Sequence, residues 1–139
     1  MLRINKKIEY GVIALLHLAG SESKVASVRE ISEQCHISET LLSKIMQKLK
    51  SSGFVSSVHG NQGGYQLAKP LSTINLLDLT KTLQGPVQVA ECLEPGHTEC
   101  PVQSTCTIVT PMTMLNQRII WLFQTTSLET LASSRKVAL

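Results

Sequence analysis

The segment of residues 92–106 constrains this chain most, because it cannot form a long helix or strand. It holds three of the four cysteines of the 139-residue sequence, separated by seven and then five residues. Pro95, Gly96 and Pro101 interrupt any regular element there. The sequence therefore predicts an irregular loop whose thiols are free to converge from different directions, with structured segments before and after it.

The cysteines of this loop indicate metal binding or thiol redox chemistry. Four cysteines are too few for a disulfide scaffold, and a local cluster in a cytosolic protein is more typical of a metal site. Zinc takes four tetrahedral ligands, which the three cysteines and His97 would supply, whereas an iron–sulfur cluster accepts cysteines with other ligands. Spacing alone does not separate these two, and a redox-active thiol cluster or three unliganded cysteines are the other interpretations. Cys35, on the buried side of a helix, is interpreted as a small apolar filler and left out of the site.

The length of the chain favours one domain with extensions, in a protein that we expect to be cytoplasmic. The distribution of its charge favours a contact with a polyanion. The chain has no basic leader before a long apolar run and no apolar stretch near ~18 residues, so we expect no membrane partner. Its net charge is only +3, but residues 40–69 contain four lysines and no acidic residue. This local excess of positive charge indicates a contact with nucleic acid.

The residues before this loop predict a helix-turn-helix. Ser27-Val28-Arg29-Glu30 has the pattern of a capping box and starts a short helix that ends near Cys35. His36-Ile37 predicts a tight turn, after which Ser38 caps a third helix that ends at Gly53. Two short helices with a basic outer face on the second are typical of a DNA-reading motif. The predicted buried residues of the third helix are Leu42, Ile45, Met46 and Leu49.

A β-hairpin is predicted directly after this helix. Residues 54–58 and 65–68 have strand character, and the glycine-rich stretch 59–64 between them predicts a flexible turn with Asn61 and Gln62 at its tip. A hairpin in this position is a wing, whose glycines allow the backbone to approach a phosphate or enter a minor groove.

Four further helices follow from apolar spacing. Residues 4–19 form the first, with Glu9 and His17 among its polar positions, and residues 73–83 form the fourth. Thr110-Pro111 predicts the start of a long helix, and residues 127–133 a short last one. The long helix carries more apolar surface than one small core needs, so we expect it to pack against a second copy in a homodimer.

The fold class expected is mainly α with a small β-hairpin: a winged helix-turn-helix domain plus a long C-terminal dimerisation helix. The expected division is residues 1–84 for DNA binding, residues 85–109 for the cysteine-rich loop, and residues 110–139 for the dimerisation helix and tail.

The sequence resembles a family of bacterial winged-helix regulators that includes IscR and NsrR. The resemblance rests on LRINKKIEYGVIALLHLA, on ISEQCHISETLLSKIMQKLKSSGFVSSVHGNQGGYQLA and on the three late cysteines, and it covers about residues 2–131. It implies a homodimer with crossed long helices, binding to a double-stranded DNA operator, and an iron–sulfur cofactor, [2Fe–2S] or [4Fe–4S], with zinc as the alternative.

The resemblance also implies a ligand set. Carried over by position, Cys92, Cys100 and Cys106 would be the thiolate ligands. Family members with a histidine ligand place it three residues after the last cysteine, where this chain has Val109. Other members take a carboxylate from the first helix of the partner subunit, and the matching position here is Glu9. The first gap between the cysteines is seven residues here and five in familiar members, and His97 within this longer gap competes as the fourth ligand.

We therefore expect a transcriptional regulator, most simply a repressor, and not an enzyme. Its operator affinity would be controlled by a cluster that senses nitric oxide, redox state or iron and cluster status. The alternative is a zinc-stabilised or thiol-redox-switched winged-helix repressor. Cys100 with His97 lacks a third orienting residue for nucleophilic catalysis. The expected DNA-binding residues are Ser38, Thr40, Ser43, Lys44, Gln47, Lys48, Lys50, His59, Asn61 and Gln62.

Overall fold

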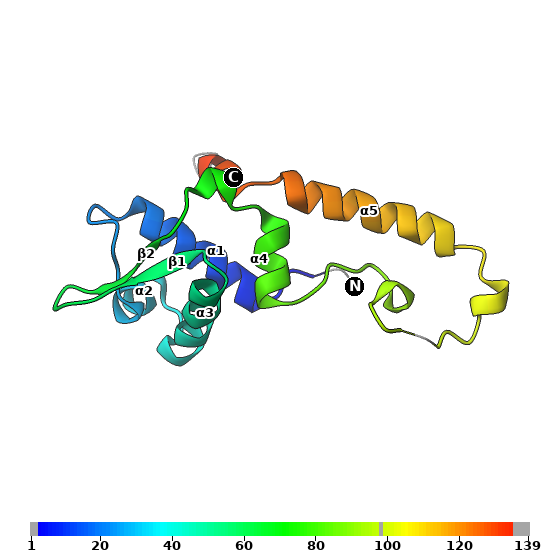
Figure 1. Cartoon of the computed structure of the whole chain (residues 1–139), viewed down its shortest axis with the longest axis horizontal. Helices are drawn as coiled ribbons and strands as arrows, with labels where there is room; N and C mark the ends of the chain where they lie inside the picture. Colours follow the sequence, from blue (N-terminus) through cyan, green and yellow to red (C-terminus); the bar gives the residue numbers. More distant parts are fainter. Residues whose placement is uncertain (1–2, 98, 135–139) are drawn as a thin grey trace.

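The computed structural model describes residues 3–97 and 99–134 and shows a mainly helical chain with one hairpin (Figure 1). This confirms the expected fold class. The elements in chain order are α1 (Lys6–Gly20), α2 (Val28–Cys35), α3 (Glu39–Ser51), β1 (Val55–Val58), β2 (Gly64–Leu67), η1 (Leu71–Thr73), α4 (Leu76–Leu83), η2 (Glu91–Leu93), η3 (Gln103–Thr105), α5 (Val109–Thr125) and α6 (Leu128–Ser133), where η marks a 3₁₀ helix.

The helix-turn-helix forms through the predicted local signals. The Ser27 hydroxyl accepts a hydrogen bond from the Glu30 amide at 3.1 Å, and the Glu30 carboxylate accepts one from the Ser27 amide at 2.9 Å, which completes the capping box. His36 then adopts a left-handed conformation with φ of 55°, which turns the chain sharply. The Ser38 hydroxyl caps α3 by accepting from the Leu41 amide. The turn and cap together set the direction of α3 relative to α2.

The core lies between α1, α2, α3 and α4. The predicted inner face of α3 is buried, and α1 contributes Ile8, Ala14, Leu15 and Leu18 to the same core. Cys35 is half-buried and packs against this core, as its interpretation as a filler predicts. With one face of α3 occupied in this way, its polar face is directed outward. The buried residues of α3 are Leu42, Ile45, Met46 and Leu49.

The wing is a two-stranded antiparallel hairpin joined to the α1–α2 connection. β1 pairs with β2 so that Val55 lies opposite Leu67 and Val58 opposite Gly64. Ala26 adds a short bridge, because its amide donates to the Tyr65 carbonyl at 3.0 Å and its carbonyl accepts from the Tyr65 amide at 2.8 Å. The bridge attaches the hairpin next to the capping box, so the wing and the helix-turn-helix form one unit.

Several helix boundaries differ from the sequence prediction by one to three residues, and the starts of the fourth helix and the long helix have identifiable reasons. The fourth helix was expected over residues 73–83, but η1 ends at Thr73 and α4 is capped by Asn75, whose side chain accepts from the Asp78 amide at 2.8 Å. The Thr73 hydroxyl instead donates to the Pro70 carbonyl. The start of the long helix also differs from the one expected at Thr110-Pro111. α5 begins at Val109, and Pro111 sits inside the first turn, where a missing N–H leaves no intrahelical bond unmade.

α5 leads away from the core and then returns the chain to it. Its N-terminal end lies with η3 at the far end of the molecule from the hairpin (Figure 1). After α5 the chain pairs with the start of α4, and the side chain of Leu128 is fully buried. No helix within the described parts of the chain has both the length and the apolar character needed to cross a membrane.

Replacement of Gly64 by alanine is expected to destabilise the fold by about 1–3 kcal/mol, as overpacking does. A Cβ at Gly64 would lie 2.4 Å from the Ala26 carbonyl oxygen, a backbone atom that cannot yield without breaking the bridge to the wing. The free energy of unfolding from urea titration measures this. Gly20→Ala is the control, because the Cβ that it adds would have no neighbouring atom within 4 Å; equal stability of the two variants would contradict the prediction.

Candidate functional site

The outer face of α3 is basic and solvent-exposed. Lys44, Lys48 and Lys50 are exposed, and none of them forms an ion pair with any residue that the structure describes. Gln47 is exposed one turn after Lys44 on the same face, and Ser43 is half-buried beside them. Ammonium, amide and hydroxyl groups along one helix face can donate to phosphates and to base edges.

A shallow groove runs beside this face and includes one residue that sequence reasoning missed. Lys44, Gln47 and Lys48 line it together with Ser51 and Ser52 at the end of α3 and with Thr82 of α4. Thr82 is half-buried. Its contribution depends on the packing of α4 against α3, which no local pattern in the sequence reveals.

The tip of the wing is polar and exposed. His59, Asn61 and Gln62 all project from the turn, which is closed by a hydrogen bond from the Gly63 amide to the Gly60 carbonyl at 3.0 Å. The hairpin extends beyond the helices at the end of the molecule opposite the long helix (Figure 1). The wing tip and the basic face of α3 thus belong to the same unit and are both open to a polyanion.

The three late cysteines lie on an irregular segment, residues 91–108, which we call the thiol loop. Cys92 is exposed, Cys100 and Cys106 are half-buried, and all three are free thiols. His97 is exposed, and its backbone amide donates to the Glu94 carbonyl at 3.1 Å. Among the described residues no three Cys, His, Asp or Glu side chains are gathered as metal ligands. The single chain therefore presents the donors without assembling them.

The thiol loop nonetheless has the donor chemistry of a metal or cluster site. Thiolates are the ligands that zinc and iron–sulfur clusters prefer, and a fourth ligand of another type is acceptable to both. Within the described part of the loop, each hydrogen bond joins residues only three or four positions apart, as from the Gln103 amide to the Cys100 carbonyl. No long-range hydrogen bond there opposes a movement of the thiols toward one another.

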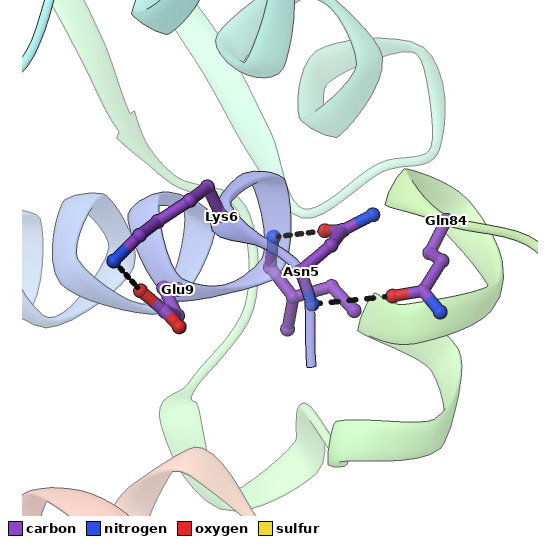
Figure 2. Close-up of polar contacts among 5 residues, drawn as sticks. Asn5, Lys6, Glu9 and Gln84 are labelled. Atoms are coloured by element: carbon purple, nitrogen blue, oxygen red, sulfur yellow. Dashed lines mark hydrogen bonds and ion pairs between the residues drawn. The ribbon is translucent and has the colours of Figure 1, made fainter. Parts of the chain in front are cut away.

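Glu9, the fourth-ligand candidate on α1, is paired within its own helix. Its carboxylate accepts a hydrogen bond from the Lys6 ammonium at 2.7 Å (Figure 2), and both side chains are largely exposed. The hydrogen bond from Lys6 and the charge of Glu9 raise the pKa of Lys6 above its ordinary value. The same end of α1 is attached to α4, since the Asn5 amide donates to the Gln84 side chain at 3.4 Å.

Cys35 lies apart from the thiol loop, against His17 of α1. The distance from its sulfur to His17 Nδ1 is 3.9 Å. The two residues line an open cleft at the C-terminal end of α1. The structure thus separates the thiol of Cys35 from the three thiols of the thiol loop.

Comparison with known proteins identifies one family over nearly the whole described chain. The profile of the Rrf2 family, described as an iron-dependent transcriptional regulator, matches residues 4–134. The protein aau3 of Rhizobium meliloti is 35% identical over 105 residues, which cover 76% of this chain and 68% of that protein. The HTH-type transcriptional regulator NsrR of Oceanobacillus iheyensis is 30% identical over 108 residues, covering 77% and 74% of the two chains.

A solved structure has the same fold. CymR (YrzC), the global cysteine regulator of B. subtilis, superposes with a TM-score of 0.75 and 27% sequence identity, covering 96% of this chain and 98% of that one. The similarity therefore extends through the thiol loop and the long helix as well as the winged helix-turn-helix.

In the reduced, metal-free protein, Cys92 is expected to react with N-ethylmaleimide faster than Cys35 by roughly an order of magnitude, because a half-buried thiol is less accessible to the reagent than an exposed one. Cys92 is exposed, whereas Cys35 contacts His17 and the core. Peptide mapping by mass spectrometry after short labelling times measures both rates. In urea the two rates should become similar; faster labelling of Cys35 in the native state would contradict the geometry.

Proposed function

We propose that this chain, which belongs to the Rrf2 family of winged-helix transcriptional regulators, is a repressor whose operator affinity depends on an iron–sulfur cluster held by the thiol loop. The chain is a regulator rather than an enzyme, as are its family and its structural neighbour. The observation that carries the cluster proposal is the presence of three free thiols on a loop whose described residues form only local hydrogen bonds. The name of the family profile, iron-dependent, agrees with it.

DNA binding is proposed to use α3 and the wing in different ways. Thr40, Ser43, Lys44 and Gln47 would face the major groove, because they share the exposed side of a helix that such a groove admits. Lys48 and Lys50 would contact phosphates. Asn61 and Gln62, at the exposed tip of the wing, would enter the adjacent minor groove, with His59 beside them. Ser38 is committed to its helix cap and would contact DNA only through its backbone.

The thiol loop is proposed to supply Cys92, Cys100 and Cys106 as thiolate ligands. When bound, a cluster would add a centre that reacts with nitric oxide or oxidants and responds to iron supply. The role of the chain is to hold the three thiolates, to leave one position for a different ligand, and to join the loop to the elements that bind DNA. The exposure of Cys92 is suited to a site that exchanges its contents with the solution.

The fourth ligand is proposed to be Glu9 of a second copy, with His97 as the competitor. Glu9 is exposed and bound only to the neighbouring Lys6 among the residues that the structure describes, so a partner chain can reach it. Solvent screens an ion pair of this kind, so Lys6 can release the carboxylate at little cost. His97 lies inside the thiol loop and is also exposed. A ligand from the partner would make the site depend on how the two copies are arranged.

A homodimer through α5 is proposed from the apolar residues on its outer side. Leu115 and Leu122 of α5 and Ile108 at its N-cap are exposed and recur every seven residues, which is the repeat of paired helices. Met114 and Trp121 are exposed beside them with the same spacing. On this proposal residues 1–84 bind DNA, residues 85–109 sense, and residues 110–139 dimerise, the last five of which lie outside the described residues.

A thiol-regulated repressor without a cluster is the second candidate. The similarity to the global cysteine regulator CymR favours it, since that alignment spans nearly all of both chains. The free and accessible loop thiols could then be the regulated groups themselves. A structural zinc ion held by the same thiols is a third arrangement, and metal analysis distinguishes all three.

Protein purified without oxygen is expected to be brown, with iron and acid-labile sulfide in equal amounts and little zinc. Glu9→Ala should then shorten the lifetime of the cluster in air severalfold, whereas His97→Ala should leave it unchanged. Visible absorption with iron, sulfide and zinc assays on one sample measures this. A colourless protein that resists reconstitution would refute the cluster, and the opposite ranking of the two variants would assign the ligand to His97.

Lys48→Ala is expected to weaken binding to specific and random duplexes alike and to reduce the slope of log K against log salt by about one unit, as loss of one phosphate contact does. Gln47→Ala should instead reduce the preference for a selected duplex, by about 1–3 kcal/mol if it reads a base. Fluorescence anisotropy at several salt concentrations measures both. Equal losses on both kinds of DNA for Gln47→Ala would remove Gln47 from the base-reading set.

A further inference from the structure

Asn116 is a buried polar side chain in the middle of α5. Its exposed fraction is 7%, and among the described residues Thr80 is the only other buried side chain that is polar or charged. Thr80 is satisfied within its own helix, because its hydroxyl donates to the Leu76 carbonyl at 2.7 Å. The Asn116 side chain differs, because both of its hydrogen bonds are made to residues outside its own helix.

Both groups of the Asn116 amide bind the segment that leads into the thiol loop, residues 87–90, which we call the loop arm. The Asn116 Oδ1 atom accepts from the Val89 amide at 2.9 Å, and its Nδ2 atom donates to Gln88 Oε1 at 3.3 Å. The side chains of Val87 and Phe123 are buried in the same region. The loop arm is therefore fixed along α5 by a side chain 27 residues away in the sequence.

This contact closes the thiol loop. All three loop cysteines lie between Val89 and Asn116, and within the described residues the hydrogen bonds of the thiol loop itself are local. Convergence of the cysteines on a ligand would pull on the two ends of the loop, the loop arm and the start of α5. Asn116 belongs to α5 and its amide binds the loop arm. The two ends of the thiol loop therefore cannot move independently while these hydrogen bonds remain.

The loop arm also borders the DNA-binding domain. Gln88 lines a cavity of about 170 Å³ together with Ile8 of α1, Ile4 just before that helix, and Gln84 at the C-cap of α4. Glu94 of the thiol loop reaches the same cavity. A shift of the loop arm would thus change its contacts with the residues of α1 and α4 around this cavity. The unfilled space leaves room for such a shift.

We infer that Asn116 is a positioning residue that couples the state of the thiol loop to the DNA-binding domain, and this inference rests on the proposed function. Its amide makes the loop arm and α5 respond together when the loop thiols take up their ligand. A leucine of similar size would fill the same space, so packing alone does not require an amide here. The two hydrogen bonds therefore serve to fix the position of the loop arm, not to fill space in the core.

The test compares three variants of the full-length protein purified without oxygen. Asn116→Leu removes both hydrogen bonds, and Gln88→Met removes only the one to the side chain of Gln88. Gln103→Leu is the control, because it removes an exposed amide inside the thiol loop. Each protein is measured with and without its cluster on one probe, a DNA duplex selected from a random library by the loaded wild-type protein.

The quantity of interest is the ratio of the two dissociation constants. In the wild type this ratio is expected to be about tenfold or more, within the usual range of coupling between sites. Asn116→Leu should retain the visible absorption of the cluster while its ratio falls toward one. Gln88→Met should be intermediate, and Gln103→Leu should match the wild type. Loss of packing alone would lower stability in both states and leave the ratio unchanged.

Amide hydrogen exchange shows which segments respond when the cluster is loaded. Loading the cluster should slow exchange in the loop arm and α5 of the wild type, but only within the thiol loop of Asn116→Leu. A wild-type ratio of dissociation constants in Asn116→Leu overturns the inference. A folded Asn116→Leu protein that cannot retain a cluster also overturns it, since the amide would then serve ligand binding. If Asn116→Leu does not fold, a wild-type ratio in Gln88→Met overturns it. A colourless wild type is seen first in the spectrum and refutes the proposed function together with the inference.

Discussion

The backbone pairing of residues 74–76 with residues 126–128 determines how the two ends of this molecule are joined. The Leu76 amide donates to the Thr126 carbonyl and the Leu128 amide to the Ile74 carbonyl, both at 2.9 Å, around the buried side chain of Leu128. One end of α5 is therefore attached to the start of α4, while its other end carries the thiol loop away from the hairpin (Figure 1). A change in the direction of α5 must act on α4, which packs against α3.

The winged helix-turn-helix could be predicted from sequence because its determinants are local. Ser27 and Glu30 are three residues apart and cap each other, and the inner residues of α3 recur at helical spacing. The start of α4 was misplaced for the opposite reason. Both Thr73 and Asn75 are competent caps, and the choice between them depends on the Thr73 hydroxyl bonding to Pro70 and on the pairing of Asn75 with Ser127, which is distant in sequence.

The candidate cluster site could be predicted only as a set of donors. The sequence predicts three thiols on an irregular loop, and on the proposed function their convergence would require the binding energy of a ligand. The structure is consistent with this, since the described residues gather no three ligands. Asn116 escaped prediction entirely, because an asparagine in an apolar helix has no local signal that reveals contacts with Gln88 and Val89.

The two kinds of ligand proposed for this site differ in what their use requires of the protein. The loop thiols must give up their present positions, but only local hydrogen bonds hold the described part of that loop. Glu9 lies on α1, whose opposite face is buried, and would need only to leave Lys6, an exposed partner whose attraction solvent weakens. On this proposal Glu9 would set the place of the site, and the loop would move to meet it. On the proposed function, movement of the loop would reach α5 through the contact of Asn116 with the loop arm. Sensing and the arrangement of the DNA-binding domains would then be one conformational change.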